Sequence, residues 1–406
     1  MKIRGKEEIN MLSLSFNLLL VAFFAFLTAT IFFAFSLSKQ RKEQTHTQTK
    51  ASKWGIVFSI IGLALSLGYF FARWSVSGHA PVSNMFEYMT ALAIAIALAF
   101  CIIYFIYPNR ADVVGLFTMP TVMLLIVYAS TFSTAVAPLV PSLQMPLMLK
   151  LHIITTVIGQ GLLAIGFAAG LAYLLRTLDL KQKSWKPRII ELMMYGLLCV
   201  VAHALVAHGF SAANYEATFS YIDENEQEAT VVYEVPPLIG PNEGELQTEG
   251  AMEPLFTVPG NIEASDLNTL IWAFAVGVVL YWLIRLLLRK RIGLAIQPLL
   301  KVSNPSTLDE FSYRAIAIGF PVFALGGLIF AMIWAQIAWS RFWGWDPKEV
   351  WALITFLFYA AYLHLRLNKG WHGEKSAWLC VIGFAIIMFN LVFVNLVIAG
   401  LHSYAS

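Results

Sequence analysis

Charged residues are scarce in this sequence. Asp, Glu, Lys and Arg make up 13% of its 406 residues, which is about half the share of an average soluble protein. Hydrophobic residues make up 59%, and a soluble domain of this composition would have to bury more apolar surface than its volume allows. The sequence therefore excludes an ordinary soluble protein and predicts a chain that crosses a membrane many times.

Cysteine is also scarce. Cys101, Cys199 and Cys380 lie far apart within apolar runs, and the chain contains no Cys-x-x-Cys pair. This spacing argues against a disulfide framework and against a thiol relay, so we interpret the cysteines as small packing residues. The sequence also lacks a visible internal repeat of the kind found in many secondary transporters, which argues against a secondary transporter.

About ten apolar stretches have the length of roughly 20 residues that a membrane-spanning helix needs. They lie near 12–37, 54–74, 85–107, 113–136, 151–176, 189–210, 267–288, 313–337, 349–367 and 376–401. The predicted fold class is therefore all-α, a polytopic membrane helical bundle with one acidic insertion. We expect N-terminal membrane helices in 1–210, the acidic insertion in 211–266, and C-terminal membrane helices in 267–406.

Lys and Arg gather at four junctions between these stretches. The junctions lie near 39–53, 176–188, 285–301 and 366–375, and all four fall on one side of the membrane if the stretches alternate. Basic loops are retained in the cytoplasm, so we expect a multi-pass protein of the cytoplasmic (inner) membrane with these junctions inside. The basic N-terminus would then lie outside, against this trend.

The segment from 211 to 266 lacks Lys and Arg and contains twelve of the 24 acidic residues. Alternation in residues 230–233, followed by Pro236-Pro237 and Gly240-Pro241, predicts a small strand-and-turn excursion. We interpret this segment as a solvated extracytoplasmic loop. The alternative is a negatively charged docking surface for a basic partner.

A tryptophan-rich segment, residues 334–349, separates the eighth and ninth apolar stretches. It contains Trp339, Trp343 and Trp345, followed by Asp346 and Glu349. Flat indole surfaces gathered in one loop are suited to a large, flat apolar ligand, whereas an interfacial aromatic belt spreads over many helices. The two carboxylates are also expected to cap the helix that follows, because acidic groups are favoured at a helix N-terminus.

Two histidines fall at the same predicted membrane level as this segment. His152 begins the fifth stretch and His402 ends the last one, both on the extracytoplasmic side of an alternating topology. A six-coordinate haem iron takes one ligand on each face of the ring, so two imidazoles beside a tryptophan cluster predict a haem site. Taken singly, each histidine is better interpreted as a helix-end cap, but their joint placement favours haem.

His364 lies at the far end of the ninth stretch. At about 1.5 Å per residue it is on the order of 24–27 Å from Asp346, so it cannot share a ring with His152 and His402. An ionisable residue within a membrane helix suggests a function, and we interpret His364 as a second haem position nearer the cytoplasm. The alternative is interfacial anchoring beside Tyr362 and Arg366.

Four basic residues are candidates for contact with haem propionates. Arg341 and Lys348 belong to the tryptophan-rich segment, while Arg73 and Lys150 lie at the same predicted level on other stretches. His79, in the loop between the second and third stretches, is a further possible ligand, although better candidates fill both axial positions.

Several motifs together resemble a known family. The run Trp339-Ser-Arg-Phe-Trp343-Gly-Trp345-Asp346-Pro-Lys-Glu resembles the WWD signature of haem-handling proteins in cytochrome c maturation, and its continuation to His364 resembles the CcsA/ResC family of the System II pathway. Further matches are Gly78-His-Ala-Pro-Val-Ser-Asn-Met-Phe-Glu87, Pro138-Leu-Val-Pro141, Asp309-Glu-Phe-Ser-Tyr-Arg314 and Gly400-Leu-His402-Ser-Tyr404. The resemblance covers roughly residues 70–176 and 305–406. Ser340 stands where the family usually has Gly, and Phe342 where it often has Tyr.

The resemblance implies a set of site residues. His152 and His402 would be the axial ligands of haem at an extracytoplasmic site, flanked by Trp339, Trp343, Trp345 and Asp346 of the WWD segment. His364 would be a haem ligand within the membrane, and its partner imidazole would belong to a CcsB/ResB-type subunit.

The resemblance also implies an activity. Haem b would be the substrate, delivered to the extracytoplasmic site and joined through its vinyl groups to the thiols of an apocytochrome c CxxCH motif. Thiol-reducing proteins would take part indirectly, and no nucleic acid is expected. The chain would be one component of a cytochrome c synthase. Because the chain itself needs no nucleophile for this reaction, whether it is an enzyme stays uncertain. A haem exporter without a ligation role and a bis-His membrane redox protein remain as alternatives.

Overall fold

The computed structural model describes residues 2–45, 47–108, 110–136, 146–222, 227–258 and 264–394. Helices dominate these residues, and nine of the helices described are long and apolar enough to cross a membrane. The predicted polytopic helical bundle is therefore confirmed. The ninth predicted stretch, 349–367, forms helix α11 (Pro347–Arg366), which has 20 residues but is less apolar than the other nine helices.

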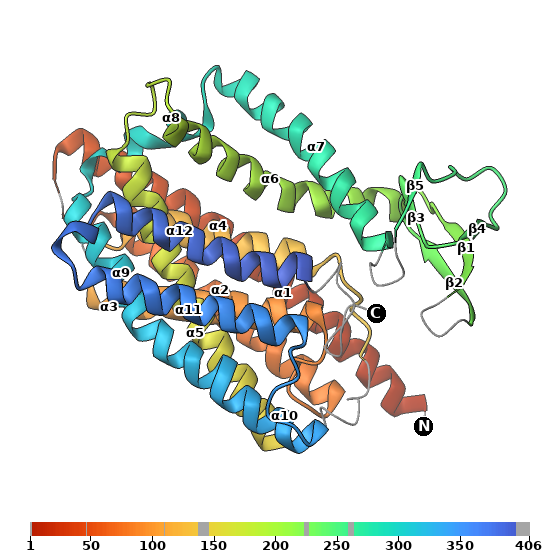
Figure 1. The fold of residues 1–406 in the computed structure, drawn as a ribbon. Coiled ribbons are helices and arrows are strands. Elements are labelled where there is room, and N and C mark those ends of the chain that lie inside the picture. The colour runs from red at the N-terminus through yellow and green to blue at the C-terminus, as the bar shows by residue number, and fades with distance from the viewer. Residues whose placement is uncertain are drawn as a thin grey trace.

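The helices follow the predicted stretches closely (Figure 1). They are α1 (Lys2–Glu43), α2 (Lys50–Ser77), α3 (Met85–Ile106), α4 (Asp112–Ala129), α5 (Pro146–Thr177), α6 (Trp185–Ala212), α7 (Ala264–Leu288), α8 (Ile292–Ile296), η2 (Gln297–Val302), α9 (Pro305–Ala324), the π-helix η3 (Leu325–Phe330), α10 (Ala331–Trp339), α11, η4 (Lys369–Trp371), α12 (Glu374–Phe389) and the π-helix η5 (Asn390–Val394). Because α10 continues to Trp339, the loop before α11 comprises only residues 340–346.

Helix α5 lies at the centre of the bundle. Within its apolar part 83% of the residues are buried inside the protein, compared with 17% for α7. It packs against α3, α9 and α12. Small residues allow the close approach: a Cβ at Gly159 would lie 2.5 Å from the backbone nitrogen of Phe323 on α9. Helices α6 and α7 pack mainly on each other and stand apart from this bundle (Figure 1).

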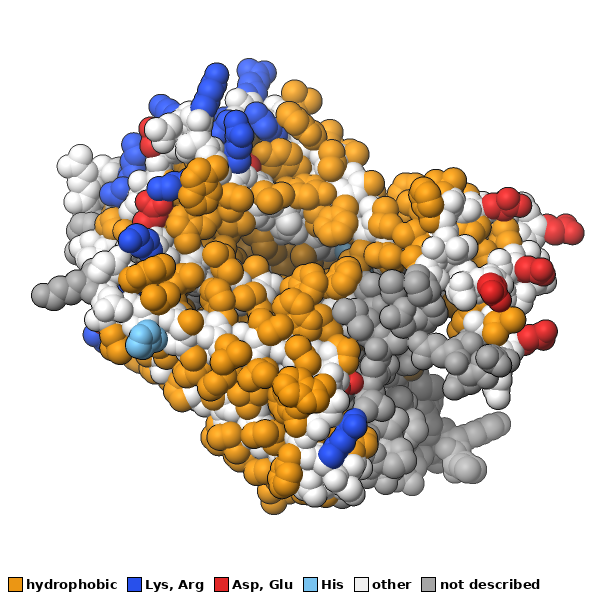
Figure 2. Space-filling model, in the orientation of Figure 1, with side chains coloured by type: hydrophobic (Ala, Val, Ile, Leu, Met, Phe, Trp, Pro, Cys, Tyr) orange, Lys and Arg blue, Asp and Glu red, His pale blue; other side chains and the backbone are white. Residues whose placement is uncertain are grey.

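The two ends of the bundle differ in charge. Lys and Arg gather at one end (Figure 2), which we call the basic end and which contains the junctions 39–53, 176–188, 285–301 and 366–375. The opposite end, called the loop end, contains residues 78–84 and the loop 340–346. The Asp and Glu side chains at the right of Figure 2 lie on the small sheets.

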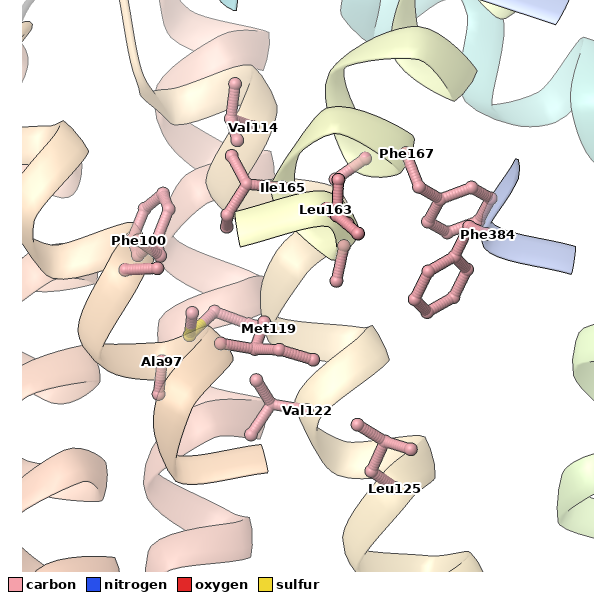
Figure 3. Close-up of a cluster of buried hydrophobic side chains, with 14 of the residues drawn as sticks. Ala97, Phe100, Val114, Met119, Val122, Leu125, Leu163, Ile165, Phe167 and Phe384 are labelled. Carbon is pink, nitrogen blue, oxygen red and sulfur yellow. The ribbon is translucent and has the colours of Figure 1, made fainter. Parts of the chain in front are cut away.

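The buried core joins helices from both halves of the chain. Phe100 of α3, Val114 and Met119 of α4, and Leu163 of α5 belong to one cluster of buried side chains (Figure 3). The rings of Phe167 on α5 and Phe384 on α12 stack at 4.5 Å. The three cysteines are buried and form no disulfide, as expected for packing residues.

The fourth predicted stretch is wrong at its end. Helix α4 ends at Ala129 and not at 136. The side chains of Ser130 and Thr131 donate hydrogen bonds to the carbonyls of Val127 and Tyr128. Local bonds of this kind compete with the helical pattern. They follow from hydroxyl chemistry, which a hydropathy pattern does not detect.

Short strands lie between α6 and α7. They are β1 (Ala217–Ile222), β2 (Glu228–Tyr233), β3 (Ile239–Gly240), β4 (Glu245–Leu246) and β5 (Phe256–Thr257). The first sheet has the order β2-β1-β4 and is antiparallel, and β3 pairs in parallel with β5. The strand predicted at 230–233 is confirmed as part of β2. Asn268 of α7 anchors the β3-β5 sheet, since its amide oxygen accepts from Leu238 and Ile239 and its amide nitrogen donates to the Ile239 carbonyl.

Candidate functional site

A large cleft opens at the loop end. It encloses about 1220 Å³, counting the open space at its mouth, and lies between α3, α5, the helix formed by α9, η3 and α10, the loop 340–346, α11 and η5. The lining side chains include Met85, Tyr88, His152, Thr156, Gln160, Phe323, Met332, Trp334, Phe342, Trp343, Lys348, Glu349, Asn390 and Leu391. Ligand sites typically combine apolar and aromatic walls with a few polar groups, and this cleft has that character.

His152 is the histidine that lines the cleft among the residues described. Its Nδ1 lies 2.9 Å from the carbonyl oxygen of Gly326, and because a carbonyl only accepts, Nδ1 carries the proton. In a neutral imidazole Nε2 is then the nitrogen with the lone pair. Histidines that bind metals usually donate their other N–H to a carbonyl or carboxylate in this way, so the chemistry of His152 fits an iron ligand.

The tryptophans of the segment 334–349 have different positions. Trp343 lines the cleft. Trp339 packs edge-on against Trp334, with ring centroids 4.7 Å apart. Trp345 is 70% exposed and meets Trp343 edge-on at 6.0 Å. The four indoles thus form two edge-on pairs, and Trp334 of one pair and Trp343 of the other line the cleft.

Asp346 and Glu349 hold the loop onto α11. The Asp346 carboxylate accepts from the Lys348 N–H at 3.0 Å, and Glu349 accepts from the N–H groups of Gly344 and Asp346 at 2.7 and 3.3 Å. This reciprocal arrangement is a capping box. The expected capping role of the two carboxylates is confirmed.

The loop contains backbone strain at Ser340. Its φ is +56°, in the left-handed region that costs a non-glycine residue about 1–2 kcal/mol. Glycine adopts this conformation without that cost. Trp345 adopts a similar conformation, with φ +58°.

Replacing Ser340 with Gly is expected to stabilise the protein. The change relieves the left-handed strain but adds freedom to the unfolded chain, leaving a net gain of about 0.5–1 kcal/mol. Thermal unfolding of the purified protein in detergent measures it. Ser340→Ala retains the Cβ and should show no gain, and a lower unfolding temperature for Ser340→Gly would contradict the assignment of strain.

His364 lies away from the cleft and is exposed on α11. Its neighbours turn inward: the Tyr362 hydroxyl lies 3.0 Å from Ser376 Oγ, and the Arg366 guanidinium binds the Asp309 carboxylate at 2.6 and 2.8 Å. Tyr362 and Arg366 therefore serve the packing of α11, while His364 faces outward from the bundle.

His402 lies outside the described residues, as does the run 138–141. The π-helix η5 is the last described element before His402 in the chain and ends at Val394. Asn390 and Leu391 of η5 line the cleft. The prediction that His402 joins His152 at one haem stays a prediction.

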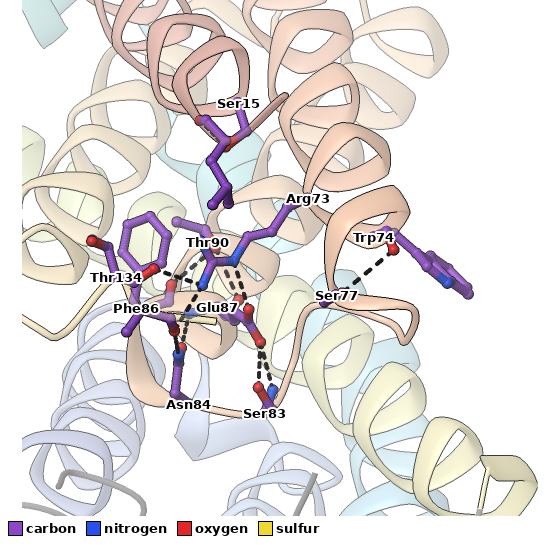
Figure 4. A network of polar contacts seen from close by, with 12 residues as sticks. Ser15, Arg73, Trp74, Ser77, Ser83, Asn84, Phe86, Glu87, Thr90 and Thr134 are labelled. Atoms are coloured by element: carbon purple, nitrogen blue, oxygen red, sulfur yellow. Dashed lines mark hydrogen bonds and ion pairs between the residues drawn. The ribbon is translucent and has the colours of Figure 1, made fainter. Parts of the chain in front are cut away.

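A buried ion pair at the rim of the cleft was not foreseen from the sequence. Arg73 is fully buried, and its Nε donates to Glu87 at 2.6 Å (Figure 4). The other Glu87 oxygen accepts from the backbone and hydroxyl of Ser83 at 2.8 and 2.7 Å. Ser83 and Asn84 line the cleft, so this pair fixes part of its rim. The sequence signal was an arginine within one apolar stretch and a glutamate opening the next.

The ion pair between Arg73 and Glu87 bears on which basic residues could contact the haem propionates. Arg73 is committed to Glu87 and to the carbonyls of Thr134 and Ala135. The Lys150 ammonium lies 5.5 Å from the centre of the Trp74 ring. Lys348 is the one of the four candidates that is among the residues lining the cleft, whereas Arg341, Arg73 and Lys150 are not.

Three other described histidines have structural contacts. His203 packs edge-on against Tyr128 at 5.3 Å, His208 Nε2 lies 3.0 Å from Ser130 Oγ, and His79 Nδ1 lies 3.0 Å from the Ala80 carbonyl. Within the described residues, no three His, Cys, Asp or Glu side chains are grouped to hold a metal ion. A haem iron, which takes four ligands from its own ring, needs no such group.

Comparison with known proteins identifies relatives over most of the chain. Residues 267–402 match the family model described as "Cytochrome C assembly protein". The chain is 30% identical over 393 residues to the "Cytochrome c biogenesis protein CcsA" of Gloeobacter violaceus, and the alignment covers 94% of each chain. Proteins of the same name from Gloeothece citriformis and Nostoc punctiforme are 30% and 29% identical over 86% of this chain.

Proposed function

This chain belongs to the CcsA family of cytochrome c biogenesis proteins, and we propose that it binds haem b in the cleft and positions it for attachment to apocytochrome c. The observation that carries the proposal is the state of His152. Its Nδ1–H donates to the Gly326 carbonyl, so Nε2 is the nitrogen that carries the lone pair. His152 also lines the cleft, together with the indoles of Trp334 and Trp343. His402 would supply the ligand on the other face of the ring.

The proposed division of labour follows from the lining of the cleft. The bound haem supplies the vinyl groups to which the client thiols add. The cleft residues supply binding, orientation and exclusion of competing reactions, which is the usual contribution of a protein to cofactor chemistry. Trp334 and Trp343 would contact the flat ring, and Lys348 would meet a propionate.

We infer an orientation with the loop end outside the cytoplasm, in the cytoplasmic membrane of the cell. The charge difference between the ends supports this orientation, because the basic junctions lie together at the opposite end and such junctions are retained in the cytoplasm. The cleft and the acidic sheets would then face the compartment in which c-type cytochromes are completed.

His364 is proposed as a ligand of haem within the membrane. Its exposure on α11 supports this role, since an outward imidazole is available to a haem shared with another subunit. The second imidazole would come from a CcsB/ResB-type partner. Haem would reach this position first and the cleft afterwards.

Replacing His364 with Ala is expected to reduce haem in the cleft by about 10-fold or more without changing the ligands of the haem that arrives, in line with the loss caused by removing groups around a metal. Haem content and absorption spectrum of the complex purified with its partner measure both quantities. His372→Ala, at the same end of the bundle, is the matched control. Full loading of the cleft in His364→Ala would reduce His364 to an anchor.

The alternative, a haem exporter, would need no contact with apocytochrome c. Cells that lack this chain should form no covalent cytochrome c. If the chain positions haem for attachment, haem added outside the cells should not restore covalent cytochrome c. Restoration by external haem would favour an exporter. Heme-staining of denatured client cytochrome reports covalent attachment directly.

A further inference from the structure

We propose that the π-helix η3 and Trp334 act as a two-point clamp that fixes the tautomer and the ring plane of His152 before haem arrives. The inference rests on the proposed function of His152 and deepens it, because it names the residues that position the ligand. Both points of the clamp belong to the helix that continues into the loop 340–346.

The first point is the carbonyl of Gly326. In a regular α-helix this carbonyl would accept the N–H of the residue four positions later. Here it accepts the N–H of Ala331, five positions later, and also the Nδ1–H of His152. A carbonyl has two lone pairs, so both bonds can form together.

Glycine is required at this point because η3 comes very close to α5. A Cβ at Gly326 would overlap Thr155 Oγ1 and the backbone nitrogen of Thr156. Thr156 also donates through its hydroxyl to the His152 carbonyl at 2.6 Å. The helical turn that begins at His152 is therefore held directly against the π-helix.

A proline precedes η3 in the chain. Pro321 lies inside α9 and cannot donate a helical hydrogen bond. Helix α9 continues past this proline, and the wider π turns begin at Leu325. π-Helical turns often occur at functional sites, and this one places its glycine carbonyl on His152.

The second point is the indole of Trp334. It lies parallel to the His152 ring, with an interplanar angle of 6° and centroids 5.8 Å apart. Trp334 is itself buried, at 3% exposure, and packs edge-on against Trp339. The hydrogen bond fixes which nitrogen carries the proton, and the stacking limits rotation about the Cβ–Cγ bond.

The clamp reduces the cost of binding. A free neutral imidazole exchanges between two tautomers and rotates. Holding the His152 imidazole in its haem-bound tautomer and orientation before haem arrives would therefore improve the affinity for haem. The clamp also couples the imidazole to the tryptophan loop, because a shift of α10 moves Trp334 and Trp339 together.

The test measures the tautomer in the haem-free protein. Histidine labelled with ¹⁵N is incorporated, the protein is held at a pH where imidazole is neutral, and the His152 signals are assigned by their loss in His152→Gln. The expected result is one species with Nδ1 protonated and Nε2 unprotonated. A proton on Nε2, or a mixture of tautomers in the unaltered protein, would overturn the clamp without requiring any further variant.

Two variants test the individual points. Gly326→Ala should produce a tautomer mixture, whereas Gly319→Ala should not. Gly319 is the matched control because it also lies at the contact of α9 with α5, where a Cβ would be 2.8 Å from the Leu162 Cβ. Trp334→Leu should keep Nδ1 protonated but broaden or double the His152 signals, and Trp334→Phe should restore a single set. Identical spectra for Gly326→Ala and Gly319→Ala would exclude a role of the glycine carbonyl, and unchanged signals in Trp334→Leu would exclude the stacking.

Failure of this test is separate from failure of the proposed function. The spectra are recorded without haem, so a chain that never binds haem can still show the clamp. Conversely, a chain that matures cytochrome c while its His152 exchanges freely would disprove only the clamp.

Discussion

Replacing Glu87 with Ala is expected to lower the free energy of unfolding by about 3–5 kcal/mol, the loss typical of breaking a buried ion pair by removing one partner. Arg73 would retain its positive charge with no exposure to water. The same change removes the acceptor of the Ser83 backbone and hydroxyl bonds. We expect the rim of the cleft to loosen together with the fold.

The controls separate charge burial from the loss of a contact. Glu310→Ala breaks the exposed ion pair with Arg314 and should cost only about 0.3–0.5 kcal/mol. The double variant Arg73→Leu with Glu87→Leu should recover part of the loss, because it removes the buried charge altogether. Thermal unfolding in detergent compares the set. A Glu87→Ala protein as stable as Glu310→Ala would contradict the structural role of the pair.

Replacing His152 with Ala is expected to lower haem binding in the cleft by at least about 100-fold, since loss of groups that merely support a ligand already costs 10–100-fold. Covalent cytochrome c should be lost with it. Added imidazole should restore both in part, because a small molecule can occupy the space left by the side chain and supply the missing nitrogen.

The informative control for His152 is another histidine at the loop end. His208 contacts Ser130 and lies on α6, so His208→Ala should leave haem content and cytochrome c formation unchanged. Normal cytochrome c maturation in His152→Ala would show that the assigned ligand is wrong. A defect that imidazole fails to relieve, in a folded protein, would indicate that His152 has another role.

Much of the fold was predictable because membrane helices are determined by long apolar runs. The helices α2, α3, α5, α6 and α7 occupy the predicted stretches, since a bilayer demands that every backbone group be satisfied within its own helix. The strand at 230–233 was predictable from alternation. The end of α4 was not, because it depends on hydroxyl bonds at Ser130 and Thr131.

The candidate site was predictable in its residue types and less so in its geometry. The sequence places His152 and the tryptophans at one membrane level, but it does not determine which indoles line the cleft. Trp345 is mostly exposed, whereas Trp334, at the start of the segment, stacks on His152. These positions depend on the register shift of η3 and the left-handed turn at Ser340, which arise from tertiary packing. The pairing of Arg73 with Glu87 likewise needs the contact between α2 and α3.

The most direct measurement of the central claim is the axial ligation of haem in the complex purified with its partner subunit. We expect a cleft haem with the spectrum of a low-spin, six-coordinate iron bound by two imidazoles. His152→Gly and His402→Gly should each convert it to a form that lacks one imidazole, and added imidazole should reverse the change. A six-coordinate bis-imidazole spectrum that persists in both variants, or a complex without haem, would contradict the account.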